Sequence, residues 1–262
     1  DEEAIKLSVN QILNHNHNNL IEDNPELEEW KVLSKPTAGS NKALQVRGSG
    51  WNKIENKGSL HELFDDIFLI DRLREVRAFL SFSRVDPQNT REGNSILANG
   101  KANSADSRPD WLPAIEVFGE GIFFKLSNTA LNKWENTNKN AFKDRQRKII
   151  EKLSDQESWV SSRYGSLLEN LPRFILVHTL SHALMRQLSF SCGYNLASIR
   201  EKLFVFEDKA GILLYTAQGD SEGSLGGLVR QGEMDLSSKL ITQAVERLMW
   251  CSNDPICSEM PE

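Results

Sequence analysis

Apolar residues recur at helical spacing in four segments of the chain. Between Ser59 and Phe79 they fall three or four positions apart, and Ser59 with Glu62 matches a capping box, so the pattern predicts a helix over residues 59–79. On the same basis we expect a charged helix and two more apolar ones, over residues 131–153, 172–192 and 237–250, with Gly193 as the C-cap of the second.

The other segments predict loops, short helices and a few strands. Residues 1–35 read as two helices, the second starting at Pro25, while 36–57 and 86–110 are rich in Asn, Ser and Gly and predict loops. Residues 113–126 predict a hairpin turning at Gly119-Glu120-Gly121. Two further strands are expected at 203–206 and 212–215.

These elements together predict an α+β (mixed α/β) fold that is helix-rich, with a small, mainly antiparallel sheet and a β-hairpin. We expect three regions. Residues 1–58 would hold N-terminal helices and a loop, 59–170 a helix, long loop, hairpin and charged helix, and 171–262 a separate C-terminal domain.

Composition excludes several classes of protein. With 39% hydrophobic and 26% charged residues the chain is typical of soluble proteins, and no apolar stretch is long enough to cross a membrane. The acidic start does not match a signal peptide, and three cysteines are too few for a disulfide scaffold. We therefore expect a cytoplasmic protein.

The net charge of −6 does not favour nucleic-acid binding, but arginines are clustered in one segment. If this segment is a helix, Arg74 and Arg77 lie one above the other on one face. Such a row can bind successive phosphates, or can pair internally with Asp71 and Glu75. The candidate DNA-binding residues are Arg72, Arg74, Arg77 and Arg84.

A glycine-rich loop between the last predicted strand and the next helix is the best candidate for an anion site. Its glycines allow the backbone N–H groups to turn inward around an anion, or simply allow a tight connection. Its acidic residues, Asp220 and Glu222, argue against a phosphate cradle. The loop also lacks the Lys-Ser/Thr ending of a nucleotide-binding P-loop, which argues against ATP binding. The candidate anion-binding residues are Gly219, Ser221, Gly223, Ser224, Gly226 and Gly227.

Two pairs of residues could bind a metal. His178 and His182 are spaced i, i+4, so both imidazoles could share an ion, but the apolar helix around them favours burial in the core. Alternatively, one of them orients the glycine-rich loop. Cys251 and Cys257 are either half of a zinc site or two free thiols, because their spacing is looser than that of most zinc clips.

Four stretches of the chain match one pattern in order. They are Leu69–Arg77 with Phe82–Arg84, Trp111–Phe123, His178–His182, and Leu214–Thr216 with Asp220–Leu228 and Cys251–Cys257. In this order they resemble DrmB, the helicase-associated subunit of the bacterial DISARM anti-phage system. The part from about Pro172 also resembles the zinc-binding C-terminal domain of MrfA-like DNA helicases. Ser81-Phe-Ser-Arg84 departs mildly from the family's Gly-Phe-Thr-Arg.

The resemblance implies a non-catalytic, DNA-binding and scaffolding module of a phage-defence complex, with a DrmA-like helicase and DNA as partners. ATP hydrolysis would belong to the helicase. Zinc would be held in part by Cys251 and Cys257 and completed by cysteines beyond Glu262, so we expect the chain to be a piece of a larger protein. The alternative is a metal-dependent nuclease or hydrolase that uses Asp220 and Glu222 with the two histidines.

Overall fold

The computed structural model describes residues 25–37, 42–54, 59–79, 81–82, 96–97, 112–154, 170–217 and 227–249. The chain divides into two compact units. One is formed by Asp1–Glu28 with Glu75–Val117, and the other by Glu29–Arg74 with Phe118–Glu262. No helix in the described ranges is long and apolar enough to span a membrane.

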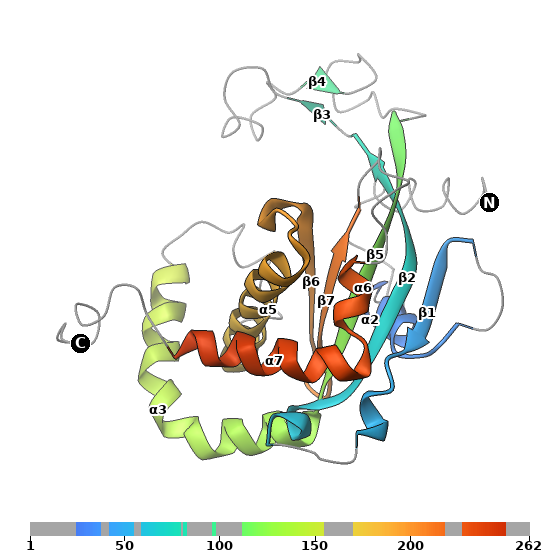
Figure 1. The fold of residues 1–262 in the computed structure, drawn as a ribbon. Coiled ribbons are helices and arrows are strands. Elements are labelled where there is room, and N and C mark those ends of the chain that lie inside the picture. The colour runs from blue at the N-terminus through green and yellow to red at the C-terminus, as the bar shows by residue number, and fades with distance from the viewer. Residues whose placement is uncertain are drawn as a thin grey trace. The chain divides into compact units, whose positions relative to one another are not determined.

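A five-stranded sheet in the order β1-β2-β5-β7-β6 forms the centre of the fold (Figure 1). β1 runs antiparallel to β2, and β7 runs antiparallel to both β5 and β6. With the helices around it, the sheet confirms the predicted α+β class. The strands are β1 (Leu44–Gly48), β2 (Phe64–Ala78), β5 (Ala114–Leu126), β6 (Ile199–Val205) and β7 (Ala210–Thr216).

The predicted charged, apolar and C-terminal helices are confirmed. Gly193 caps the apolar helix with a φ of 72°, in the left-handed conformation expected of a C-cap glycine. Pro25 opens the helix predicted there, while the helix expected before it lies outside the described residues. The α-helices are α2 (Pro25–Leu33), α3 (Asn128–Ser154), α5 (Leu171–Cys192), α6 (Gly227–Gln231) and α7 (Met234–Leu248).

Both faces of the sheet are buried, each under different helices. On one face, strand residues such as Leu69 and Phe124 join side chains of α5 and α7 in one apolar cluster. On the opposite face, Phe123 and its neighbours cluster with Trp30 and Leu33 of α2. The sheet is therefore the middle layer between α2 and the α5–α7 pair (Figure 1).

Three predictions within the five-stranded sheet were wrong. Residues 59–79 form a short 3₁₀ turn, Ser59–Leu63, followed by strand β2 rather than a helix. Residues 114–126 form one continuous strand, so Gly119-Glu120-Gly121 is not a turn. The segment predicted as a loop at 36–57 contributes edge strand β1.

Burial on both faces explains the error at β2. Ile67, Phe68, Leu69 and Ile70 are all nearly inaccessible to solvent, so the alternation of apolar and polar residues that marks a half-exposed strand is absent. Apolar residues also fall three or four positions apart, at Leu60, Leu63, Ile67, Ile70 and Leu73, and this spacing imitates a helix.

The other unit contains a short two-stranded sheet. β3 (Ser81–Phe82) pairs antiparallel with β4 (Ile96–Leu97), so part of the predicted 86–110 loop is a strand. In the same unit the Phe79 amide donates to the Pro113 carbonyl at 2.9 Å.

Candidate metal centre

Helix α5 places two histidines together at the surface. Its buried positions include Val177, Ser181, Leu184 and Leu188, spaced so that one side of the helix faces the sheet. His178 and His182 lie beside this buried face, with 43% and 52% of their side chains exposed. The prediction that the two histidines are buried in the core was therefore wrong.

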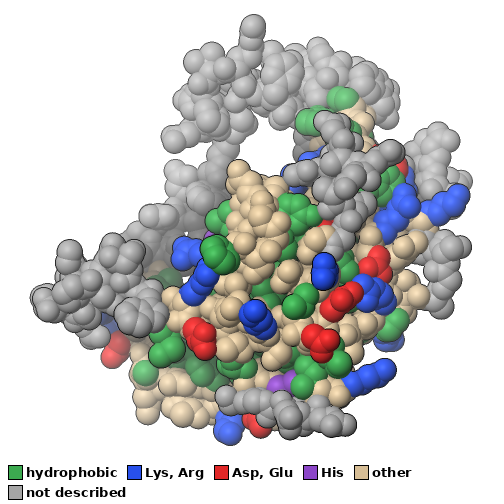
Figure 2. Space-filling view, viewed as in Figure 1, with side chains coloured by type: hydrophobic (Ala, Val, Ile, Leu, Met, Phe, Trp, Pro, Cys, Tyr) green, Lys and Arg blue, Asp and Glu red, His purple; other side chains and the backbone are tan. Residues whose placement is uncertain are grey.

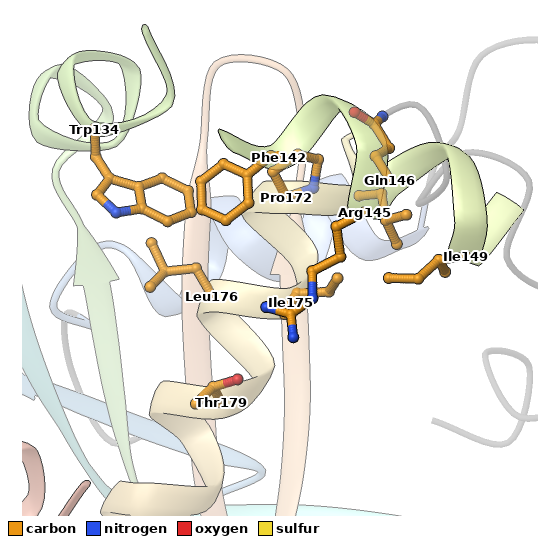
Figure 3. Close-up of a pocket in the computed structure, with 10 residues that line it drawn as sticks. Trp134, Phe142, Arg145, Gln146, Ile149, Pro172, Ile175, Leu176 and Thr179 are labelled. Atoms are coloured by element: carbon orange, nitrogen blue, oxygen red, sulfur yellow. The ribbon is translucent and has the colours of Figure 1, made fainter. Parts of the chain in front are cut away.

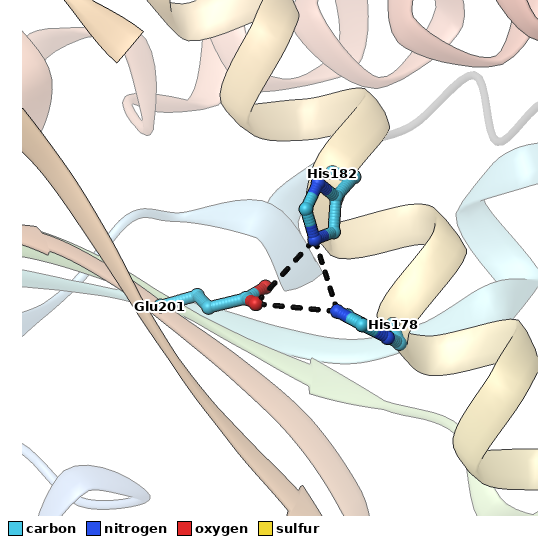
Figure 4. Close-up of side chains that lie close together, drawn as sticks. All are labelled: His178, His182 and Glu201. Carbon is cyan, nitrogen blue, oxygen red and sulfur yellow. Dashed lines mark hydrogen bonds and ion pairs between the residues drawn. The ribbon is translucent and has the colours of Figure 1, made fainter. Parts of the chain in front are cut away.

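Glu201 on strand β6 supplies a carboxylate to the same point (Figure 4). The His178 and His182 Nε2 atoms are 2.9 Å apart, and they lie 3.3 and 3.5 Å from Glu201 Oε1. These three groups form the only cluster of possible metal ligands among the described residues. Sequence patterns gave no sign of Glu201, because it joins the histidines only through packing of β6 against α5.

Ser181 fixes the orientation of the carboxylate. Its hydroxyl is fully buried and donates to Glu201 Oε2 at 2.5 Å, which leaves Oε1 to face the two imidazoles. Outer hydrogen bonds of this kind orient ligands at metal sites. Two nitrogens and one oxygen within this distance are a donor set that suits zinc and neighbouring transition metals.

A hollow of about 250 Å³ opens beside the histidines. It is lined by His178, Thr179, His182, Ala183, Arg186 and Leu248, the last at the end of α7. Solvent ions can therefore reach the imidazole nitrogens from this side.

The predicted DNA-binding arginines lie on or after β2. Because β2 is a strand, Arg72 and Arg74 share a face, whereas residues three apart such as Arg74 and Arg77 do not stack as predicted. The Arg72 guanidinium lies 4.5 Å from the centre of the Phe118 ring. Arg77 forms an ion pair with Glu75.

Arg84 lies outside the described residues. Among the coloured residues of the face in Figure 2, basic and acidic side chains are interspersed and form no broad basic area.

Most of the glycine-rich loop also lies outside the described residues, as do Cys251 and Cys257. This applies to Gly219, Asp220, Ser221, Glu222, Gly223, Ser224 and Gly226. Gly227 is the first residue of α6, and an added Cβ there would approach Tyr194 Oη to 3.2 Å.

A buried carboxylate that the sequence did not reveal holds the end of this loop. Glu120, 1% exposed, accepts hydrogen bonds from the Leu228 amide at 2.9 Å and the Tyr194 hydroxyl at 3.3 Å. Burial, with the nearby charge of Glu120, raises the pKa of the Cys192 thiol to about 11. Cys192 is therefore an uncharged thiol at neutral pH, partly buried against the apolar cluster of α5 and α7.

An apolar pocket of about 420 Å³ lies between α3 and α5 (Figure 3). Trp134, Phe142, Ile149 and Leu176 line it, and Arg145 is the charged residue among its described lining residues. Its described lining includes none of the residues predicted to bind metal, DNA or an anion.

Two comparisons with known proteins bear on the candidate metal residues and on the resemblance to DrmB. Residues 180–259 match the profile of the MrfA Zn-binding domain, a segment that includes His182, Glu201 and both C-terminal cysteines. The chain is also 37% identical over 201 residues, 75% of its length, to the DISARM protein DrmB of Bacillus paralicheniformis. It spans about a third (34%) of that relative. The chain is therefore DrmB-like, with a segment of the MrfA Zn-binding type at residues 180–259.

Proposed function

We propose that this chain is a zinc-binding, non-catalytic part of a DISARM-type phage-defence component. The observation that carries the proposal is the presence of both similarities on one chain, to DrmB over 201 residues and to the MrfA Zn-binding domain over 180–259. ATP hydrolysis would belong to a DrmA-like helicase partner, because the glycine-rich loop lacks the Lys-Ser/Thr of a nucleotide-binding P-loop.

Cys251 and Cys257 would supply two ligands of a structural zinc site in this proposal. Both lie within the segment that matches the Zn-binding domain. A closed structural site needs four nitrogen or sulfur ligands, so further ligands would complete it. Its contribution would be to hold the C-terminal segment after α7 in a fixed conformation.

Zinc analysis of the purified protein tests this function. We expect bound zinc in the parent protein and loss of about one ion in Cys251→Ser, with lower thermal stability, because a structural site contributes its binding energy to folding. Cys192→Ser is the matched control and should retain the zinc, since Cys192 is a partly buried thiol that donates to the Gly227 carbonyl. A Cys251→Ser variant with full zinc content would refute the cysteine site.

DNA would be contacted through the arginines Arg72, Arg74, Arg77 and Arg84 and through the backbone of the glycine-rich loop. Support comes from the density of arginines on and after β2 and from the partial exposure of Arg72 and Arg74. Arginine suits phosphate contact because its planar group can donate two hydrogen bonds at once.

A metal-dependent nuclease or hydrolase is the second candidate. The observation that favours it is the convergence of His178, His182 and Glu201, since two histidines and a glutamate also form the zinc sites of some hydrolases. Incubating the purified protein with DNA and Mg²⁺, Mn²⁺ or Zn²⁺ distinguishes the two. We expect no cleavage, and cleavage lost in Asp220→Ala or His182→Ala would favour the enzyme.

A further inference from the structure

We propose that His178, His182 and Glu201 bind one divalent transition-metal ion, of which zinc is the natural example, at a site separate from the cysteines. The ligand atoms would be the two Nε2 atoms and Glu201 Oε1. This site goes beyond the cysteine-held zinc of the proposed function and does not depend on it.

The distances between these atoms are those of a metal's ligand shell. Zinc binds histidine nitrogen and carboxylate oxygen at about 2.0–2.2 Å, and tetrahedral ligands at that radius lie about 3.3 Å from one another. The observed separations of 2.9, 3.3 and 3.5 Å scatter around this value. A small movement of the side chains would therefore complete the site around an ion.

Ordinary ion pairing explains the cluster less well. An ion pair joins one imidazole to the carboxylate, whereas here the two Nε2 atoms also face each other at 2.9 Å, so three ligand atoms converge on one point. A divalent ion accepts lone pairs from both nitrogens and from Oε1 at once. Ser181 then acts as an outer-shell residue, because its hydroxyl binds Oε2 and directs Oε1 toward the histidines.

The donor set and the surroundings decide the class of ion. Two nitrogen donors favour Zn²⁺, Co²⁺, Ni²⁺ or Cu²⁺ over Mg²⁺ and Ca²⁺, which prefer oxygen. Three protein ligands leave a fourth position, and the half-exposed histidines face a hollow that solvent can enter. Water or a ligand from outside the chain can therefore occupy that position.

Cobalt titration tests the proposal, because Co²⁺ substitutes for zinc and its spectrum reports the ligands. In a Cys251→Ser/Cys257→Ser background we expect visible d–d absorption that saturates at about one Co²⁺ per chain, without a near-ultraviolet thiolate band. Zn²⁺ should displace the cobalt. Ca²⁺ in excess should not.

Variants of the three ligands and of control positions distinguish binding at this site from binding elsewhere on the protein. We expect His178→Ala, His182→Ala and Glu201→Gln each to weaken Co²⁺ and Zn²⁺ binding by more than about 100-fold, since even outer-shell changes cost about 10–100-fold. Ser181→Ala should fall within that smaller range. The controls Thr179→Ala, which also lines the hollow, and Glu207→Gln, on the connection after β6, should bind as the parent does.

Unchanged metal binding in all three ligand variants would overturn the proposal. So would loss of the histidine-held ion in Cys251→Ser alone, because histidines and cysteines would then share one ion. If the Cys251→Ser/Cys257→Ser variant does not fold, the histidine variants are tested in the protein that keeps both cysteines. There His178→Ala/His182→Ala should lower zinc content by about one ion and leave the cysteine-held ion in place, and an unchanged content would count against the site.

Each of the two zinc proposals, the cysteine site and the histidine site, can be refuted without refuting the other. A protein without cysteine-held zinc can still bind Co²⁺ at the histidines, and one without histidine-held metal can still lose zinc on Cys251→Ser. Circular dichroism should show that the histidine variants remain folded. His178 and His182 are half-exposed, so their removal opens no core cavity.

Discussion

Gly119 shows how a single atom constrains the centre of the sheet. A Cβ added there would lie 1.4 Å from the Thr216 carbonyl oxygen on β7, and one at Gly121 would lie 2.8 Å from the Leu214 carbonyl oxygen. The two glycines around Glu120 are needed because β5 and β7 approach closely, not because the chain turns. The same sequence of residues had predicted a hairpin turn.

Gly119→Ala should therefore be strongly destabilising. The clash is with main-chain atoms that cannot rotate away, so we expect a loss of about 3 kcal/mol or more in the free energy of unfolding, at or above the usual range for overpacked cores. Urea denaturation followed by circular dichroism measures this loss.

Gly48→Ala is the matched control for that measurement. Gly48 also lies in a strand, but an added Cβ would meet nothing within 4 Å, so its free energy of unfolding should change by less than about 1 kcal/mol. Equal stability of the two variants would show that β5 and β7 are not in this close contact.

Helix α5 contacts α3, α6, α7, β6 and β7, and Arg173 in its first turn contributes to these contacts. Arg173 is 2% exposed and forms a two-fold ion pair with Glu135 of α3, at 2.7 and 3.0 Å. It also donates to Asn132 and to the Phe206 and Glu207 carbonyls between β6 and β7. One guanidinium thus joins α3 and the β6–β7 connection to α5.

Removing this guanidinium should uncouple those elements. We expect Arg173→Ala to lower the free energy of unfolding by about 1.5–3 kcal/mol, because the carboxylate and carbonyls lose a charged hydrogen-bond partner in a partly buried setting. Arg173→Lys should recover only part of this loss, since an ammonium group cannot reproduce the planar, forked donors. Thermal and urea unfolding measure both changes.

Arg147→Ala provides the surface comparison. Its pairs with Asp144 and Glu151 are exposed and longer, at 3.5 and 3.9 Å, so its removal should cost less than about 1 kcal/mol. A similar small effect for Arg173→Ala would mean that its contacts contribute little to stability.

At the scale of the whole molecule, charge opposes the proposed DNA contact. The chain carries a net charge of −6, and any binding would have to come from a local group of arginines. On β2, Arg72 and Arg74 share a face, so they are the pair whose side chains can act together.

Salt dependence tests whether that pair touches DNA. Arg72→Ala/Arg74→Ala should weaken binding equally for all sequences and flatten the plot of log affinity against log salt by about 0.9 per lost phosphate contact. Fluorescence anisotropy at several salt concentrations gives both values.

Arg145→Ala/Arg147→Ala removes the same charge from α3 and is the control. If DNA binds at β2, this control should keep most of the salt slope of the parent. Equal effects of the two double variants would indicate nonspecific attraction, and no effect of either, with lower stability of the β2 variant, would assign Arg72 and Arg74 to the fold.

The sequence alone determined the elements whose signals are local. α5 was predicted from its apolar periodicity, Pro172 and Gly193, and β6 and β7 from two short apolar runs around a polar connection. Hydrogen bonds inside a helix and caps at its ends lie within a few residues of one another, so a short window of sequence contains the necessary information.

Only the tertiary structure decided β2, β5 and the cluster of His178, His182 and Glu201. β2 is a strand because β1 and β5 pair with it and helices cover both of its faces, and these partners lie outside the segment itself. Glu201 joins His178 and His182 because β6 packs against α5, with the Ser181 hydroxyl holding the carboxylate in place. Pairing and packing between separate segments leave no periodic trace in either segment, and these contacts position the three side chains of the cluster.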